Sequence, residues 1–259
     1  LGKINFNSGD SGNGLQAIDD KMPTAWEEPW GAGMSTGVRL VDGVGSSLNI
    51  QYTTPTILGT TIVVAMAPDT GVTDTADKTV ATANGESAET FDATVNINPS
   101  LGTEILSGLN LFVGASYTEQ YGNEIDGSGL EEDNYEAAGG VTYDLGPLSV
   151  GAQWSGEWLG EYSSATAPNS YKNHAFGVAF NVNDNLSISY GEHTSRKAGY
   201  NHSTAWQGEN SRRIEVSSVQ IAYTMGGASV RVASVDADNI LFSSGANRSA
   251  TILSMGLAF

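Results

Sequence analysis

The chain contains no cysteine, and this absence removes several classes of protein from consideration. Without thiols it has no disulfide framework, no cysteine-bound zinc and no cysteine nucleophile. Long hydrophobic runs are also lacking. The longest strongly apolar run is 62–67, whereas a membrane helix needs about 20 such residues. If the chain crosses a membrane, it must therefore do so as a closed β-barrel, which leaves no backbone polar group unpaired in hydrocarbon.

Basic residues are scarce. The chain has 11 Lys and Arg against 29 Asp and Glu, which gives a net charge of −18. Nucleic-acid-binding proteins, and proteins held on anionic membranes by charge alone, need an excess of positive charge, so we expect neither activity here. The first residues also lack a positive region followed by an apolar core, so we do not expect them to be a signal peptide. For an exported protein we expect a processed or truncated N-terminus.

What the chain does have is a two-residue alternation of apolar and polar side chains. The clearest example is its end, 250–259, in which Leu253, Met255, Leu257 and Phe259 share one parity. A strand with this pattern has one apolar and one polar face. About eleven other segments repeat it, beginning with Lys3–Asn7, and helical heptads are absent.

The connections between these segments alternate between short and long. Short turns fall at 146–147, 183–185 and 226–227, and long polar, often acidic connections separate them. This alternation of short and long connections predicts an all-β protein. The predicted fold is a transmembrane antiparallel up-and-down β-barrel in which residues 1–259 form a single domain. A soluble β-sandwich and a soluble barrel are the alternative folds. A sandwich of this size would seldom keep a polar face on every strand.

The alternating strands, the terminal Phe259 and the long acidic connection after the first strand resemble general diffusion porins of the outer membrane. The sequence at 19–25, DDKMPTA, is similar to the loop motif of the alphaproteobacterial type. The resemblance implies that 8–45 is a constriction loop folded into the barrel lumen. Its candidate constriction residues are Asp19, Asp20, Lys21, Glu27 and Glu28. The alternative is that some of these carboxylates only cap or anchor the loop.

The resemblance also implies a strand count. Porins of this kind have about 16 strands, whereas about 12 are visible here. If Lys3–Asn7 corresponds to the fifth strand, the visible strands complete a barrel of sixteen. We therefore expect about four N-terminal strands to be missing from the sequence as given.

Strand parity assigns side chains to the two faces of the predicted wall. The charged residues with polar parity, expected to face the lumen, are Lys3, Asp92, Glu136, Asp144, Glu157 and Arg231. The aromatic residues expected in a membrane-interface girdle on the opposite face are Tyr52, Tyr143, Tyr190, Tyr223 and Phe259. Several residues expected to face the lumen are small, which favours either open space in the lumen or a loop lying close to the wall. These residues are Gly114, Gly140, Gly151, Gly177 and Ala179.

These features predict a passive aqueous channel in the bacterial outer membrane for small hydrophilic solutes and ions. Pore size and the field of charged side chains at the narrowest point set the selectivity of such a channel. The negative net charge favours a mild cation preference. We expect no enzymatic activity, no cofactor and no nucleic-acid partner. Outer-membrane lipid and lipopolysaccharide are the expected surroundings, and the resemblance implies a homotrimer.

Two functions of other classes remain open. An outer-membrane phospholipase barrel could use His174 or His193 to activate Ser189 or Ser195. A surface adhesin or phage-receptor barrel would be filled by bulky lumen side chains, which the small residues on that parity disfavour. The sequence GDSG at 9–12 resembles the nucleophile motif of trypsin-like proteases, but a catalytic triad is defined by geometry rather than by a tetrapeptide.

No metal site is predicted. The acidic stretches 131–133 and 236–239 could bind Ca²⁺ loosely through carboxylate oxygens. Neither has the glycine and terminal glutamate of an EF-hand loop.

Overall fold

The computed structural model describes residues 1–68, 89–99, 104–119, 133–159, 168–199 and 212–257. Twelve strands form one antiparallel sheet in which each strand pairs with the next along the chain. They are β1 (Lys3–Asn7), β2 (Asn49–Thr53), β3 (Thr60–Ala67), β4 (Thr90–Ile97), β5 (Leu109–Thr118), β6 (Asn134–Leu145), β7 (Leu148–Trp158), β8 (Pro168–Asn183), β9 (Leu186–Gly199), β10 (Arg212–Met225), β11 (Ala228–Asp238) and β12 (Arg248–Leu257). The all-β, up-and-down prediction is confirmed. The two-sheet sandwich is wrong, because the twelve strands share one sheet.

The helical elements are short. They are η1 (Gly14–Ile18), α1 (Glu104–Ser107) and η3 (Ile240–Phe242). In the part of the chain that the structure describes, no helix is both long and apolar enough to cross a membrane.

The two faces of the sheet differ as the alternation predicts. On one face large apolar side chains are exposed, among them Phe6, Val113 and Leu253. On the opposite face polar side chains are buried, for example Asn173 and Ser218. A water-soluble sheet would bury its apolar face and expose its polar one. We call the exposed apolar face the outer face, and the face with buried polar groups the inner face.

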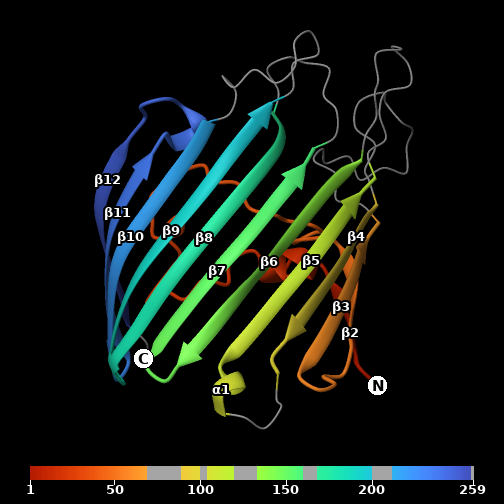
Figure 1. Ribbon diagram of the computed structural model, residues 1–259, viewed down its shortest axis with the longest axis horizontal. Coiled ribbons are helices and arrows are strands. Elements are labelled where there is room, and N and C mark those ends of the chain that lie inside the picture. The colour runs from red at the N-terminus through yellow and green to blue at the C-terminus, as the bar shows by residue number, and fades with distance from the viewer. Residues whose placement is uncertain (69–88, 100–103, 120–132, 160–167, 200–211, 258–259) are drawn as a thin grey trace.

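The strands form one curved wall, with the short turns along its lower edge (Figure 1). The turns after β6 and β10 each use a glycine with positive φ: Gly146 at 64° and Gly226 at 60°. A two-residue hairpin needs this left-handed backbone, which glycine adopts without steric cost. Most of the predicted long connections at 69–87 and 119–133 lie outside the described residues, as does Phe259.

The sheet is open within the described residues. Strand β1 pairs only with β2, and β12 pairs only with β11. The predicted ring of strands is therefore not closed here, and the count of sixteen strands stays a prediction.

Residues 8–48, which connect β1 to β2, cross the inner face, and we call them the inner segment. Leu15, Ile18 and Met22 pack against Phe112 of β5 and Ala138 of β6. Further along, the inner segment packs against the other end of the sheet, in a cluster made of Ala32, Met34, Ile214, Val216, Ala233, Val235, Ala237 and Ile240. The apolar core thus lies between the inner segment and the wall.

The connection between β11 and β12 also reaches the inner segment. Leu241 donates its backbone N–H to the Thr36 carbonyl at 2.9 Å. The Phe242 ring lies 5.6 Å from the Tyr171 ring, centroid to centroid. Asn239, Leu241 and Phe242 all have positive φ, which is strained for residues other than glycine. The contacts to the inner segment and to β8 hold this turn in place.

Candidate functional site

Four polar residues on successive strands are paired side by side across the inner face. We call this set of paired residues the register row. Asp92 of β4, Ser116 of β5, Glu136 of β6 and Glu157 of β7 are joined pairwise by the strand register. All four are buried. Carboxylates on neighbouring strands repel each other and lose hydration when buried, so each needs a specific partner. The inner segment supplies those partners.

Asp92 holds two distant parts of the inner segment together. Its Oδ2 accepts backbone N–H bonds from Leu15 at 2.7 Å and from Val44 at 2.9 Å. The residues before these donors are glycines, and a Cβ at Gly43 would come within 2.3 Å of the same oxygen. Glycine at this position therefore lets the backbone approach the carboxylate closely.

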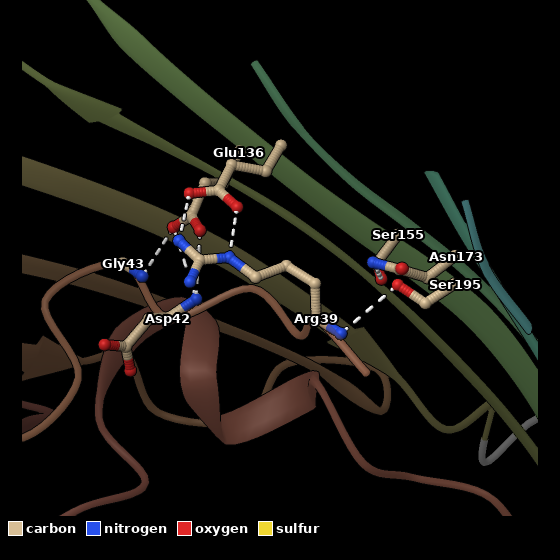
Figure 2. A network of polar contacts seen from close by, with 8 residues as sticks. Arg39, Asp42, Gly43, Glu136, Ser155, Asn173 and Ser195 are labelled. Carbon is tan, nitrogen blue, oxygen red and sulfur yellow. Dashed lines mark hydrogen bonds and ion pairs between the residues drawn. The ribbon is translucent and has the colours of Figure 1, made fainter. Parts of the chain in front are cut away.

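Glu136 and Glu157 bind the next part of the inner segment. Glu136 accepts the backbone N–H of Asp42 at 3.2 Å and that of Gly43 at 2.6 Å. Glu157 accepts a bidentate pair from Arg39, with Nε to Oε2 at 2.6 Å and Nη2 to Oε1 at 2.8 Å. Figure 2 shows the Arg39 side chain extending beside the Asp42 and Gly43 amides.

Arg39 has two further contacts with the wall. Its backbone N–H donates to the Ser195 hydroxyl of β9 at 3.2 Å, and its guanidinium lies 5.5 Å from the centroid of the Tyr171 ring. Beside Ser195, the Asn173 amide donates to the Ser155 hydroxyl at 3.1 Å (Figure 2). The guanidinium therefore interacts with both a carboxylate and an aromatic ring, and both stabilise the cation.

Two glutamine side chains hold the middle of the inner segment through its backbone. Gln153 of β7 accepts the Lys21 N–H at 3.3 Å and donates to the Asp19 carbonyl at 2.6 Å. Gln220 of β10 accepts the Glu27 N–H at 3.1 Å and donates to the Glu27 carbonyl at 2.6 Å. An amide side chain can satisfy both groups of an irregular backbone, which a carboxylate cannot.

Small wall residues make room for the inner segment. A Cβ at Gly177 would lie 2.6 Å from the Pro23 carbonyl oxygen, and one at Gly151 would lie 2.6 Å from Pro23 Cδ. A Cβ at Gly114 would lie 2.9 Å from Leu15 Cδ1. Small residues on this face could leave open space or make room for a close-lying loop. At Gly114, Gly151 and Gly177 the structure shows the second, because the inner segment lies against them.

The five predicted constriction residues lie along this anchored stretch. The side chains of Asp20, Lys21 and Glu27 are exposed, Asp19 is partly buried and Glu28 is buried. Burial and the nearby Asp20 carboxylate raise the pKa of Asp19 to about 8. Burial, with smaller effects from Asp20 and Glu27, raises the pKa of Glu28 to about 7. The Glu28 carboxyl is therefore covered by the fold, and the role of these five residues in a constriction stays a prediction.

The six predicted lumen charges divide into two groups. Lys3 and Asp144 are exposed at the inner face and Arg231 is partly exposed there. The other three are the carboxylates of the register row. They lie on the predicted face, where the inner segment covers them and uses them as hydrogen-bond acceptors.

The predicted girdle tyrosines lie on the outer face. Tyr52, Tyr190 and Tyr223 are exposed and Tyr143 is partly exposed. A second aromatic group was not predicted from the sequence. It is a row of residues paired across β4 to β7, made of Phe91, Tyr117, Tyr135 and Trp158. Each member is visible in the alternation, but only the strand register shows that they are neighbours.

The residues that hold the inner segment were not predicted from the sequence either. They are Arg39, Gln153 and Gln220. The signal for the glutamines was present, since they are long polar side chains on a parity otherwise rich in glycine and serine. The signal for Arg39 was that the inner segment has only two basic residues, the other being Lys21.

The phospholipase pairing has no support in the described residues. The Ser189 hydroxyl accepts the Ala25 N–H at 2.9 Å, and the Ser195 hydroxyl accepts the Arg39 N–H. His174 is exposed on the outer face, whereas His193 is buried and its Nε2 has no hydrogen-bond partner. Both candidate hydroxyls therefore serve as anchors of the inner segment.

The described residues contain no group of three or more His, Asp or Glu side chains that could hold a metal ion. Of the two acidic stretches considered for Ca²⁺, residues 131–132 lie outside the described residues. Asp236 accepts a hydrogen bond from the Ser249 hydroxyl at 2.5 Å.

No protein-family model matches the chain, and no curated protein matches it. Solved structures do match. The outer membrane channel DcaP of Acinetobacter baumannii has a TM-score of 0.61 at 12% identity, covering 98% of this chain and 70% of that one. An anion-selective porin from Comamonas acidovorans scores 0.59 at 11%, with 100% and 73% covered. Salmonella typhi OmpF, solved with daunomycin, scores 0.64 at 12%, with 99% and 74% covered. At these identities the likeness shows the fold: the chain has the β-architecture of outer-membrane channels and porins.

Proposed function

We propose that the protein is an outer-membrane porin, a passive aqueous channel for small hydrophilic solutes and ions. The observation that carries this proposal is the pairing of an exposed apolar outer face with a polar inner face crossed by an anchored segment. A wall of this kind suits lipid on one side and water on the other. The shared fold with channel proteins supports the same reading.

The inner segment, and within it the predicted constriction loop 8–45, would narrow the channel. Register-row carboxylates and wall glutamines bind its backbone, which leaves several of its side chains free to face the solute path. Asp20 and Glu27 are exposed, so they would supply a negative field at the narrowest point. We therefore propose a mild cation preference. An anion-selective porin shares this fold, so the preference depends on these side chains rather than on the architecture.

The test is the reversal potential of single channels in a potassium chloride gradient. We expect a potential of the sign that cation flow produces, and a shift towards zero in the Asp20→Asn, Glu27→Gln double variant. Asp144→Asn is the matched control, because Asp144 is also exposed at the inner face but lies on β6, away from the inner segment. Anion selectivity would refute the cation preference, and the absence of any conductance would refute the channel.

Four finer points are part of the proposal. They are a barrel of about sixteen strands, a homotrimer, kinship with the alphaproteobacterial type of porin, and contact with outer-membrane lipid and lipopolysaccharide. Native mass spectrometry of the protein extracted from membranes would give the number of subunits. A monomer in that measurement would remove the trimer from the proposal.

We also propose that the protein has no enzymatic activity and needs no cofactor, with any Ca²⁺ bound loosely at exposed carboxylates. The assay is lipid hydrolysis in the presence of calcium. A rate that both His174→Ala and His193→Ala abolish would show a phospholipase instead.

A further inference from the structure

The strand pairing that defines the register row continues across β8, β9 and β10 of the inner face. It pairs Glu157 of β7 with Tyr171 of β8. It then pairs Tyr171 with Lys197 of β9, and Lys197 with Arg212 of β10. Lys197 is partly exposed and Arg212 is exposed. At this height the wall is therefore acidic on β6 and β7 and basic on β9 and β10.

The acidic and basic ends differ in how their charges are balanced. Glu136 and Glu157 are buried, and the inner segment supplies their hydrogen-bond donors. Among the described residues, no carboxylate forms an ion pair with Lys197 or Arg212. Directly paired residues on neighbouring strands have Cβ atoms about 5 Å apart, and two like charges there repel each other. The basic end of the row therefore attracts an anion.

Two carboxylates near Arg212 belong to the other face of the wall. Arg212, Glu215 and Asp238 border a hollow of about 430 Å³, which Lys197 does not line. Glu215 and Asp238 are paired with each other across β10 and β11 and have the parity of the outer face. Glu215 forms its ion pair with Arg213, which also has outward parity. These two acids therefore leave the charge of Lys197 on the inner face unbalanced.

Two aromatic rings lie against the basic end of the row. Lys197 Nζ lies 5.6 Å from the centroid of the Phe242 ring, and Arg212 Nη1 donates to the Phe242 carbonyl at 3.4 Å. The Phe242 ring lies 5.6 Å from the Tyr171 ring, which the half-exposed Arg39 guanidinium approaches to 5.5 Å. Phe242 has a φ of 56°, and such strained residues cluster where a fold binds a ligand. Cations and rings thus alternate along this part of the inner face.

We propose that Lys197, Arg212, Tyr171 and Phe242 form a binding site on the inner face for a small aromatic carboxylate. The carboxylate accepts N–H groups from the two basic side chains, and the ring of the solute packs against the two aromatic rings. This inference rests on the proposed function, because solutes pass the inner face only in a channel. It names a class of solute that binds the wall. The overall cation preference still depends on the exposed carboxylates of the inner segment.

The experiment measures how benzoate, added on both sides of the membrane, reduces the single-channel current. Acetate carries the same charge without a ring, and benzyl alcohol carries the ring without a charge. A contact between aromatic rings is worth about a fivefold gain in affinity, so we expect benzoate to reduce the current at concentrations about fivefold lower than acetate. Benzyl alcohol should have no effect. Recordings at low salt keep the screening of the exposed charges small.

The variants separate the roles of charge and ring. An exposed ion pair is worth up to about a fivefold change in affinity, so the Lys197→Gln, Arg212→Gln variant should need about tenfold more benzoate for the same block. Phe242→Leu should bring benzoate close to acetate and leave acetate unchanged. The matched control is Lys172→Gln, Arg196→Gln, which removes a directly paired Lys and Arg from the outer face. This control should be blocked like the parent.

Equal block of the parent by acetate and benzoate would overturn the aromatic class of solute. An equal change in the outer-face control would overturn the site. Benzoate binding to the same variants in detergent is measured in parallel by saturation-transfer NMR. A protein that binds benzoate through Lys197 and Arg212 without conducting would refute the channel and leave the site standing. A channel whose inner double variant binds benzoate like the parent would refute the site and leave the proposed function standing.

Discussion

Arg39 of the inner segment and Glu157 of β7 form a bidentate ion pair that joins the segment to the wall. The Glu157 side chain is 2% exposed, whereas that of Arg39 is 50% exposed. Glu136 lies beside Glu157 in the strand register and receives backbone N–H groups from the residues just after Arg39. Arg39 thus neutralises the Glu157 end of an acidic row, while half of its own side chain stays exposed to solvent.

Replacing Arg39 with Gln should loosen the inner segment. The change leaves the Glu157 carboxylate buried without its cation, and breaking a buried pair in this way costs about 3–5 kcal/mol. Because Arg39 is half exposed, we expect about 2 kcal/mol, seen as a lower thermal unfolding temperature and faster proteolysis within 8–48. Arg39→Lys should lose less, since it keeps the charge and gives up only the bidentate geometry. Equal stability of parent and Arg39→Gln would contradict the anchoring role.

Adding a methyl group at Gly177 should displace the inner segment. The new Cβ would lie 2.6 Å from the Pro23 carbonyl oxygen, a backbone atom that cannot rotate away. Such overpacking costs about 1–3 kcal/mol, and a displaced segment should change single-channel conductance. Gly139→Ala is the control, since its Cβ would meet nothing closer than the Phe112 carbonyl at 3.3 Å. The same conductance in both variants would argue against close packing at Gly177.

Selectivity should depend on pH. The pKa of Asp19 is raised to about 8 and that of Glu28 to about 7, in both cases chiefly by burial. Both carboxyls are neutral below these values and charged above them. The cation preference should therefore increase as the pH rises from 6 to 9, as read from reversal potentials. The Asp19→Asn, Glu28→Gln variant should lack this increase; if it retains the increase, other groups cause it.

The same shifts have a consequence for stability, with the opposite sign. In the unfolded chain these carboxyls titrate near their ordinary pKa values of 3.8 and 4.5. Between those values and about 7 to 8, the folded protein binds more protons than the unfolded chain. Their contribution to stability is therefore largest at low pH and is lost as the pH rises through 7 and 8. A thermal unfolding temperature that falls between about pH 4 and pH 8 in the parent, but not in the Asp19→Asn, Glu28→Gln variant, would support this interpretation.

Much of the wall could be predicted from sequence because side-chain direction in a strand repeats every two residues. Lys3–Asn7 is a strand with the predicted bounds, and the turns at Gly146 and Gly226 lie where their glycines indicated. The site was harder to predict. Asp92, Glu136 and Glu157 were placed on the polar face, but parity alone cannot show that a segment covers them.

The anchors of the inner segment depend on contacts between residues far apart in the chain. Gln220 binds Glu27 across 193 positions and Arg39 binds Glu157 across 118, so no local pattern links either pair. The aromatic row of β4 to β7 was missed for a related reason, since it exists only once the strand register is fixed.

The most direct test of the central claim is a thiol-block experiment on single channels. The chain has no cysteine, so Asp20→Cys places one thiol on the exposed part of the inner segment, and Val113→Cys places one on the outer face. A water-soluble, positively charged methanethiosulfonate should reduce the current of Asp20→Cys channels and leave Val113→Cys channels unchanged. A protein that conducts with no block at position 20 would contradict the placement of the inner segment in the solute path, and a protein that never conducts would contradict the channel itself.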